Sequence, residues 1–475
     1  MSGERFADYS FIFQQYSGLQ LQLVNFLDQT HPIRNRRDIE NYLARLELVA
    51  GQMNEGIAQA KERAARGIVP PRFILTATIK QFDRFLAAAP HQNILVASLE
   101  ERAAKIRDLP TFELTNFLAI AEKTMSLSII PAFRTAQVLL QEHLLRSTDD
   151  AGLWRFPDGD QAYSQALHRF TTTDYSATQI HQLGLVEVAR IENQMDGLFR
   201  QVGYNKGSIK ERMRQLDADS QPPSQPDPRP AILAKYAEIL RDAEQRAALI
   251  FDLRPKASVV VKREPSFTEE NAAAHYSVPA PDGSRPGVFW VPLPGPTFRI
   301  SEMRTLLYHE AVPGHHFQIA LQSEMADLPR FRRDRVFGSI PAHGEGWALY
   351  AEQLAAECGW YEGDPKGHLG QLNAELFRAR RLVVDTGLHA MHWSRQQAVD
   401  YGTPVSEVER YVVSPGQACS YKIGQLRILE LRSRYQRAQS NSFSLKEFHN
   451  IILRTGTVPL GVLEQVVEAH LRPSK

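Results

Sequence analysis

Apolar residues recur at three- and four-residue steps along most of the chain, which is the period of an amphipathic helix. In the first 160 residues, one such stripe is formed by Leu75, Ile79, Phe82 and Leu86. Prolines and Ser, Thr, Asp or Asn caps separate one helical run from the next. From Ile300 to the C-terminus the same pattern returns. The pattern therefore predicts a mainly α fold.

Two short segments have the composition of β-strands instead. Residues 257–262 read Ala-Ser-Val-Val-Val-Lys, and residues 287–291 read Gly-Val-Phe-Trp-Val. Both are rich in residues that favour a pleated, half-buried surface. Pro292 and Pro294 follow the second segment and end it, because proline cannot donate to a strand ladder. We expect a small sheet beside the helices.

The proline-rich residues 221–230 interrupt the helical pattern, because proline lacks an amide donor. Helical patterns of similar character flank this segment, so we favour a long loop inside one domain over an interdomain linker. At 475 residues, the chain is long enough for more than one unit. We expect an N-terminal helical region at residues 1–160, followed by a catalytic region at residues 161–475 that continues the same structure.

The composition is that of a soluble globular protein, with 43% hydrophobic and 23% charged residues and a net charge of +1. This balance requires neither nucleic acid nor an anionic membrane as partner. The basic cluster Arg330–Arg333 is short, and a solvated helix or loop explains it better than a phosphate site. No stretch approaches the ~18–20 apolar residues that cross a bilayer. We expect no nucleic-acid or membrane partner.

The N-terminus has no apolar core of a secretory signal, and the two cysteines, Cys358 and Cys419, suit a reducing compartment. A cytoplasmic protein is therefore expected. The pattern leaves the oligomeric state open, a homodimer included.

Candidate chemistry begins at His309-Glu310. Zinc peptidases commonly hold the metal with histidines at i and i+4 of a helix, and the glutamate after the first is the general base. Here i+4 is a proline, and the next histidines are His315 and His316. In an unbroken helix, His315 would point about 120° away and His316 would lie about 10 Å further along. The Pro-Gly pair at 313–314 permits a bulge that brings His315 back, so we favour His315 as second ligand and keep His316 as the alternative.

A third ligand is expected further along the chain. Glu345 and Glu352 are seven residues apart and so share one face of a helix. One carboxylate could bind the metal, while the other holds a ligand imidazole from behind. A solvated helix face is the plain alternative. The glycines on both sides of Glu345 and the adjacent Trp347 argue against it, so we expect Glu345 as ligand and Glu352 as its supporting residue.

Three further residues carry alternatives. Asp385 and His389 lie one helical turn apart. On a cleft face, Asp385 would orient His389, and His389 would donate to an oxyanion or contact substrate; on a surface, they would be part of an ordinary salt-bridged stripe. Arg427 could bind the terminal carboxylate of a substrate, because guanidinium matches that geometry, or it could be structural.

Three motifs together carry a resemblance to a known family. They are His309-Glu-Ala-Val-Pro-Gly-His-His316, Glu345-Gly-Trp-Ala-Leu-Tyr-Ala-Glu352 and Ser420-Tyr-Lys-Ile-Gly424. The chain resembles the bacterial domain-of-unknown-function 885 family over roughly residues 165–460. More distantly, it is similar to the zinc peptidases related to thimet oligopeptidase, angiotensin-converting enzyme and the Taq-type carboxypeptidases.

The distant resemblance implies a fold and some roles. In those peptidases, a glutamate ligand is followed seven residues later by another, as Glu345 is here, and the Taq-type motif G-x-x-x-x-Y-x-x-G fits Gly416, Tyr421 and Gly424. The implied fold is neurolysin-like: two helical halves around a deep cleft lined by a small sheet. An edge strand there would pair with substrate, and residues 287–290, with Phe289, are the candidate. The interrupted histidine spacing departs from that pattern.

The resulting hypothesis is a Zn²⁺-dependent hydrolase of short peptides, with a carboxypeptidase as one option. Glu310 would be the general base, and Tyr421 would donate to the developing oxyanion. His316, Phe289 and Arg427 are the candidate substrate contacts. A zinc amidase for a non-peptide amide and a helical binding protein with a disabled site are the alternatives.

Overall fold

The computed structural model describes residues 6–265, 269, 272–280 and 283–471. The chain is mainly helical with one three-stranded sheet, which confirms the predicted fold class at this level. Two compact units are present. Unit 1 comprises Met1–Tyr163, Leu388–Asp400 and Pro404–Ser414, and unit 2 comprises Ser164–Gly387, Tyr401–Thr403 and Pro415–Lys475. Unit 1 therefore contains not only the N-terminal region, expected to end at residue 160, but also two segments from the C-terminal half of the chain.

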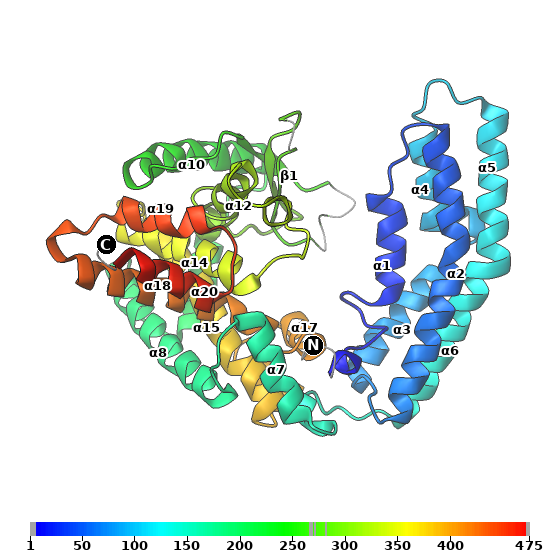
Figure 1. Ribbon diagram of the computed structural model, residues 1–475, viewed down its shortest axis with the longest axis horizontal. Coiled ribbons are helices and arrows are strands. Elements are labelled where there is room, and N and C mark those ends of the chain that lie inside the picture. The colour runs from blue at the N-terminus through cyan, green and yellow to red at the C-terminus, as the bar shows by residue number, and fades with distance from the viewer. Residues whose placement is uncertain (1–5, 266–268, 270–271, 281–282, 472–475) are drawn as a thin grey trace. The chain divides into compact units, whose positions relative to one another are not determined.

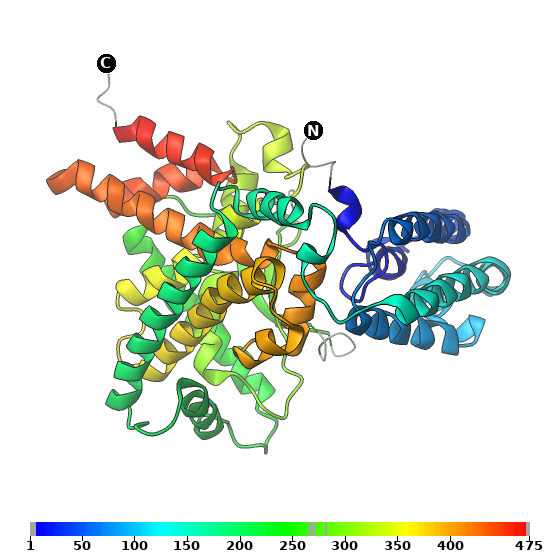
Figure 2. The same ribbon diagram turned by 90° about the horizontal axis from the view of Figure 1, so that it is seen from below.

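Long helices that lie side by side form unit 1 (Figures 1 and 2). The longest begins after Asn35, whose side chain accepts a hydrogen bond from the amide of Asp38 and so caps the helix. Its helices are α1 (Leu19–Asn25), α2 (Arg36–Ala65), α3 (Arg72–Ala87), α4 (Ile94–Ala103), α5 (Thr111–Thr124), α6 (Ile130–Arg146), α16 (Arg395–Asp400) and α17 (Val405–Val413), with π-helical turns at Phe26–Thr30 and Met125–Ile129 and 3₁₀ turns at Ala7–Tyr9, Pro90–Gln92 and Leu153–Arg155.

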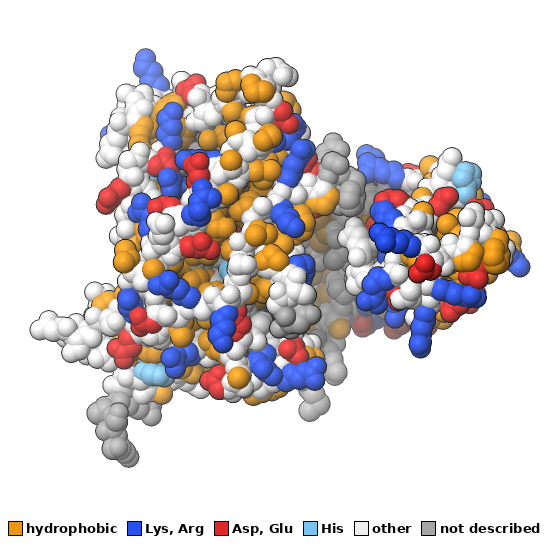
Figure 3. Space-filling model, turned by 90° about the horizontal axis from the view of Figure 1, so that it is seen from above, with side chains coloured by type: hydrophobic (Ala, Val, Ile, Leu, Met, Phe, Trp, Pro, Cys, Tyr) orange, Lys and Arg blue, Asp and Glu red, His pale blue; other side chains and the backbone are white. Residues whose placement is uncertain are grey.

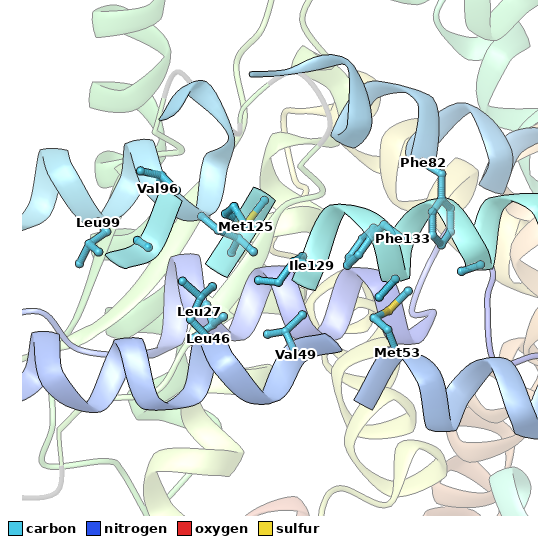
Figure 4. Close-up of a cluster of buried hydrophobic side chains, with 14 of the residues drawn as sticks. Leu27, Leu46, Val49, Met53, Phe82, Val96, Leu99, Met125, Ile129 and Phe133 are labelled. Carbon is cyan, nitrogen blue, oxygen red and sulfur yellow. The ribbon is translucent and has the colours of Figure 1, made fainter. Parts of the chain in front are cut away.

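The core of unit 1 confirms the predicted apolar stripe. Leu75 and Phe82 of α3 are buried, and Ile79 and Leu86 pack against the same cluster. Figure 4 shows Phe82 with Phe133 and Met53 at one end of this cluster, where three helices meet. Each such side chain contributes about 1.5–3 kcal/mol when it leaves water, which stabilises the bundle.

Helices also dominate unit 2, where α14 and α18 cross with their backbones in contact. A Cβ at Gly424 would lie 1.8 Å from the carbonyl oxygen of Ala342, and one at Gly346 would lie 2.5 Å from the carbonyl carbon of Gly424. Only glycine permits this approach at either position. The helices are α8 (Ala177–Gln201), α9 (Ile209–Asp219), α10 (Arg229–Ile250), α11 (Met303–Glu310), α12 (His315–Glu324), α13 (Arg330–Arg333), α14 (Pro341–Glu357), α15 (Pro365–Ala390), α18 (Ser420–Gln439), α19 (Leu445–Thr455) and α20 (Leu460–Leu471), with 3₁₀ turns at Ile300–Glu302, Gln417–Cys419 and Ser440–Ser442; α7 (Gly159–Thr171) and α15 cross the division between the units.

The sheet has the strand order β1-β3-β2. β1 (Val259–Arg263) and β3 (Gly287–Val291) correspond to the two predicted strands, and β2 (His275–Ser277) is additional. β3 pairs with β1 in parallel and with β2 in antiparallel orientation, so both of its edges are occupied. The expectation that residues 287–290 form an edge strand for substrate is therefore wrong. Phe289 is fully buried and packs edge-on against Tyr236 of α10, at 5.5 Å between ring centroids, so it is a core residue and no substrate contact.

Residues 221–228 of the proline-rich segment form a loop between α9 and α10 within unit 2, as predicted, whereas Arg229 and Pro230 already belong to the first turn of α10, where a proline needs no amide partner. Gln221 fixes the start of the loop, because its side chain donates to the carbonyl of Phe298 and accepts from the amide of the same residue, both at 2.7 Å. None of the described helices combines the length and the hydrophobicity that a membrane-spanning helix needs. On the face shown in Figure 3, acidic and basic side chains are interspersed, in keeping with the small net charge.

Candidate metal centre

The chain reverses between α11 and α12, at the interrupted histidine motif. α11 ends at Glu310, and Ala311 leaves the helical region with φ −112° and ψ −96°. A Cβ at Gly314 would lie 1.9 Å from the carbonyl oxygen of His309. The loop can therefore fold against the end of α11 only with glycine at this position. α12 then starts at His315, which brings this side chain back toward α11.

Trp347 of α14 holds the reversal in place. Its indole N–H donates to the carbonyl oxygen of Pro313 at 2.9 Å, in a fully buried hydrogen bond. The ring also packs against Phe251 and His449, which fixes its orientation. The residue two positions after Glu345 therefore anchors the loop that positions His315.

His309, His315 and Glu345 form a compact cluster of ligand atoms, all within 4.8 Å of one another. The Oε2 atom of Glu345 lies 3.5 Å from Nε2 of His309 and 3.5 Å from Nε2 of His315. In a tetrahedral zinc site with bonds of about 2.0–2.1 Å, ligand atoms lie about 3.4 Å apart. Two imidazoles and one carboxylate are also a typical donor set of a catalytic zinc site. The residues present therefore fit a zinc ion.

The cluster is accessible from one side. His309 is buried, whereas the side chains of His315 and Glu345 keep 14% and 24% of their surface exposed. Catalytic zinc sites need such an opening, because the fourth coordination position has to receive water or substrate.

Glu352 supports His309 from behind. Its Oε1 lies 2.7 Å from Nδ1 of His309, and its Oε2 accepts a hydrogen bond of 2.6 Å from the hydroxyl of Thr305. Arg378 lies 3.9 Å from the same carboxylate. With Nδ1 of His309 facing Glu352, Nε2 faces Glu345 and is the nitrogen that a metal would bind after releasing its proton.

Charge and burial set the pKa values of the cluster. Burial alone would lower the pKa of His309, but Glu345 and Glu352 raise it to about 9. Burial would raise the pKa of Glu345, yet His315 and His309 hold it well below its usual range. Burial raises the pKa of Glu310, against the opposing charges of His315 and His309. A carboxyl with a raised pKa suits a group that takes and then releases a proton.

His316 has a different role from His315. Its Nδ1 lies 2.9 Å from the hydroxyl of Tyr276, and its Nε2 lies 3.1 Å from the carbonyl oxygen of Ala257. Burial lowers the pKa of His316 to about 4. With both ring nitrogens engaged, His316 links α12 to the sheet region. The structure thus brings His315 to the cluster, and the expectation of His316 as alternative ligand or substrate contact is not met.

His389 and Asp385 do not form the expected pair at a cleft. His389 is fully buried in unit 1, where Nδ1 accepts from the amide of Leu153 at 3.1 Å and Nε2 lies 3.0 Å from the carbonyl oxygen of Tyr411. Both nitrogens are therefore used by backbone, which corrects the oxyanion-donor and substrate-contact hypotheses. Both carboxylate oxygens of Asp385 accept from the amide of Gly416, at 2.9 and 3.2 Å, and so hold the turn before α18.

Arg427 is also not available in the way the substrate hypothesis required. Its guanidinium pairs with Glu430 at 2.6 Å and with Glu464. A bound carboxylate would have to displace these two acidic side chains, so the structural alternative holds for this residue.

Tyr421 lies in the first turn of α18. Its ring packs under the guanidinium of Arg381, at 4.4 Å from the ring centroid. The crossing of Gly346 and Gly424 brings this part of α18 alongside the turn of α14 that carries Glu345. The oxyanion role of Tyr421 stays a prediction.

Thr305 and Arg378 are site residues that the sequence interpretation missed. Thr305 lies four residues before His309 on α11 and so shares its face, a spacing that could have identified it. Arg378 lies on α15, and no local pattern connects it with Glu352.

Comparison with known proteins assigns the chain to a family. The family model described as "Bacterial protein of unknown function (DUF885)" matches residues 3–467. The chain belongs to this family. The match includes the first 160 residues, for which the motifs gave little indication. The description of the DUF885 family states no activity. The relation of this chain to thimet oligopeptidase stays a prediction.

Two solved structures are similar to this DUF885 protein. "The crystal structure of the putative lipoprotein from Colwellia psychrerythraea" has a TM-score of 0.91 and 35% identity, covering 97% of this chain and 81% of that one. "The structure of a putative lipoprotein of unknown function from Shewanella oneidensis" has a TM-score of 0.71 and 18% identity, covering 98% of this chain and 84% of that one, and shows the fold alone. The comparison with curated proteins gave no match.

These descriptions contradict the expected cytoplasmic location. Both similar structures are named as putative lipoproteins, which are proteins that a covalently attached lipid anchors to a membrane. The expectation rested on the lack of an apolar signal core in the first residues of the sequence and on the two cysteines. The number of cysteines does not distinguish the two sides of a membrane, because an exported protein can fold without disulfides.

Proposed function

We propose that this chain is a zinc-dependent hydrolase that cleaves amide bonds in short peptides. The observation that carries the proposal is the cluster of His309, His315 and Glu345, in which both imidazoles lie 3.5 Å from one carboxylate oxygen. The buried carboxyl of Glu310, directly after the first ligand, supplies a base. The Thr305 to Glu352 to His309 chain of hydrogen bonds supports a ligand role over an incidental histidine pair.

Zinc bound at this cluster would polarise the scissile carbonyl and make a water more acidic. His309, His315 and Glu345 would hold the ion, and Glu352 would keep the imidazole of His309 in the required orientation. The carboxylate of Glu310 would take a proton from the attacking water and deliver it to the leaving nitrogen. Tyr421 would donate its hydroxyl proton in a hydrogen bond to the carbonyl oxygen as negative charge develops.

The proposal includes a neurolysin-like zincin fold and the distant relation to thimet oligopeptidase. Its support is the helix that carries His309-Glu310, the glutamate on a later helix, and the second glutamate seven residues on that contacts His309. The interrupted histidine spacing is compatible with it, because the loop at 313–314 returns His315 to the first ligand.

We also propose that the protein works outside the cytoplasm at a membrane, which replaces the expectation from the sequence that it has no membrane partner. The relative with 35% identity is named as a lipoprotein, and that name supports the location.

The deciding experiment combines elemental analysis with peptide hydrolysis. The wild-type protein should hold about one zinc ion per chain and cleave members of a short-peptide library. The variant Glu310→Gln should keep zinc and lose about 10²–10⁴-fold in rate, because only the base is removed. Glu357→Gln at the far end of α14 is the matched control and should retain activity.

Other outcomes have distinct meanings. A protein that stays metal-free at micromolar zinc would refute the metal centre. Bound zinc without cleavage of any peptide would redirect the search to non-peptide amides, which the same residues could hydrolyse.

A further inference from the structure

Residues 329–338, between α12 and α14, combine exposed apolar side chains with four arginines, of which Arg330 is exposed; we call this segment the basic-aromatic lobe. It contains the short helix α13. Phe337, Val336 and Phe331 are 85%, 63% and 49% exposed. Single exposed apolar residues are common, but three within seven positions form an apolar patch, and such patches mark sites that bind another apolar surface.

The lobe is an ordered element of unit 2. The guanidinium of Arg332 donates to the carbonyl of Thr455 at the end of α19, and the side chain of Gln322 donates to the carbonyl of Arg332 at 2.7 Å. Within the lobe, the amide of Val336 donates to the carbonyl of Phe331 at 3.0 Å. The phenylalanine rings at 331 and 337 touch edge-on, at 5.7 Å. The tip is therefore held in position by contacts at its base.

The lobe also carries a net positive charge. The lobe contains four arginines and one aspartate. Among the described residues, the one ion pair of the lobe joins Arg330 and Asp334 at 3.0 Å, and the side chain of Arg330 is still 86% exposed. The buried Nε of Arg333 has no hydrogen-bond partner in the described part of the chain. Most of the lobe's positive charge is thus not neutralised by acidic side chains nearby.

We propose that the basic-aromatic lobe docks the protein on an anionic phospholipid surface. Phe331, Val336 and Phe337 would enter the boundary between headgroups and acyl chains, where aromatic and aliphatic side chains are stabilised. The arginines would meet the lipid phosphates, while their stems lie along the apolar layer. An acidic protein would satisfy the arginines alone. Exposed aromatic and aliphatic side chains next to arginines are the composition of segments that lie in a membrane interface, which favours the phospholipid surface.

The lobe contains none of the residues of the candidate metal centre, but it is covalently joined to two helices that carry them. The lobe joins α12, which begins with His315, to α14, which carries Glu345. Docking would therefore hold both ligand-bearing helices close to the membrane. The inference goes beyond the proposed hydrolysis, because lipid binding is measured without any catalytic step.

Co-sedimentation with vesicles tests the proposal on the full chain without any lipid attached. Vesicles of phosphatidylcholine with about one third phosphatidylglycerol should bind the protein at low salt, and vesicles of phosphatidylcholine alone should bind it at least about tenfold more weakly. Binding should fall as salt rises, because phosphate contacts are screened.

Two lobe variants separate the two contributions. Arg330→Gln with Arg333→Gln should lower the affinity by about 25-fold, since each arginine near an anionic surface is worth about fivefold. Val336→Ser with Phe337→Ser should lower it by about tenfold and leave the salt dependence unchanged. Leu249→Ser is the matched control, because Leu249 is 74% exposed on α10 of the same unit.

Folding is checked by the melting temperature and zinc content of each variant, which should equal those of the wild type. The proposal is overturned if the wild type does not bind anionic vesicles, or if it binds neutral vesicles equally well. It is also overturned if Leu249→Ser weakens binding as much as the lobe variants do. Binding to polyglutamate without binding to vesicles would assign the lobe to an acidic protein partner instead.

Discussion

Gly314 decides which histidine joins the cluster with His309 and Glu345. Its backbone lies so close to the end of α11 that no side chain fits, and this contact folds the chain back at the position where a zinc helix would normally continue. The close approach of His309 and His315, which are six residues apart in the sequence, is therefore produced by one backbone contact and by the hydrogen bond from Trp347.

Gly314→Ala should consequently lose zinc. The new Cβ would meet the carbonyl oxygen of His309 at 1.9 Å, so the loop has to move and take His315 with it. We expect at least about a tenfold loss in zinc affinity. Gly344→Ala is the control, because its Cβ would meet only Gln318 Oε1, at 4.0 Å, and zinc binding should persist. Competition against a chelator measures both; equal affinities would refute the role of the bulge.

Removing the hydroxyl of Thr305 tests the support behind His309. Thr305→Val keeps the shape of the side chain but removes the hydroxyl that donates to Oε2 of Glu352 at 2.6 Å. Outer partners of ligating histidines typically contribute about 10–100-fold to metal affinity, and a loss toward the lower end is expected here. Thr305→Ser should retain most of the affinity. A valine variant with unchanged zinc affinity would show that Glu352 holds His309 without help.

The two histidines can be separated by substitution. His315→Ala should lose zinc, because it removes a ligand atom. His316→Ala should keep zinc but unfold more easily, because it leaves the hydroxyl of Tyr276 and the carbonyl of Ala257 without their partner. Zinc content and urea unfolding of both variants distinguish the roles, and the reverse pattern would make His316 the ligand.

At the scale of elements, the crossing of α14 and α18 positions the later part of the site. Gly424→Ala would place a Cβ 1.8 Å from the carbonyl oxygen of Ala342, so the helices have to separate. We expect a loss of about 1–3 kcal/mol in the free energy of unfolding. Gly461→Ala on α20 has nothing within 4 Å of its Cβ and should be neutral or slightly stabilising. Urea unfolding measures the stability of both variants. Equal free energies of unfolding would contradict a close backbone contact between α14 and α18.

Helices and the two longer strands could be predicted, because their apolar periods are visible in the sequence. β2 has three residues, too few to show a period, and its pairing made β3 a central strand. The clustering of His309, His315 and Glu345 could be predicted because Pro313-Gly314 and the paired glutamates are local signals in the sequence. The partners of His389, by contrast, are backbone groups of Leu153 and Tyr411, and no spacing reveals contacts to such distant segments.

At the scale of the whole molecule, a buried charge cluster ties three helices of unit 2 together. The ammonium of Lys422 on α18 lies 2.8 Å from Glu187 on α8 and 2.7 Å from Glu375 on α15. Burial would raise the pKa of both carboxyls, but Lys422 and Arg190 hold them below their ordinary value. Carboxyls with a lowered pKa stabilise the fold above about pH 4.5 and lose this contribution as the pH falls through their folded values.

The unfolding free energy should therefore drop on acidification below about pH 4.5. Lys422→Met should cost about 3–5 kcal/mol at pH 7, because it leaves buried carboxylates short of positive charge, and its acid loss should be smaller. Lys446→Met removes only an exposed pair with Asp252, so it should change little. Urea unfolding at pH 7, 5 and 4 decides; parallel pH profiles of wild type and Lys422→Met would exclude this cluster as the cause.

The division of unit 1 among three stretches of chain has a consequence for biosynthesis. Leu153 and Trp154 bind to His389 and to the carbonyl of Leu388, which follow more than two hundred residues later. A ribosome therefore has to release residue 414 before the first unit can be completed, and by then most of unit 2 has already emerged. Cutting the gene after residue 163 would leave the N-terminal bundle without its returning segments, so a fragment meant to fold alone has to carry Leu388–Ser414 on a linker.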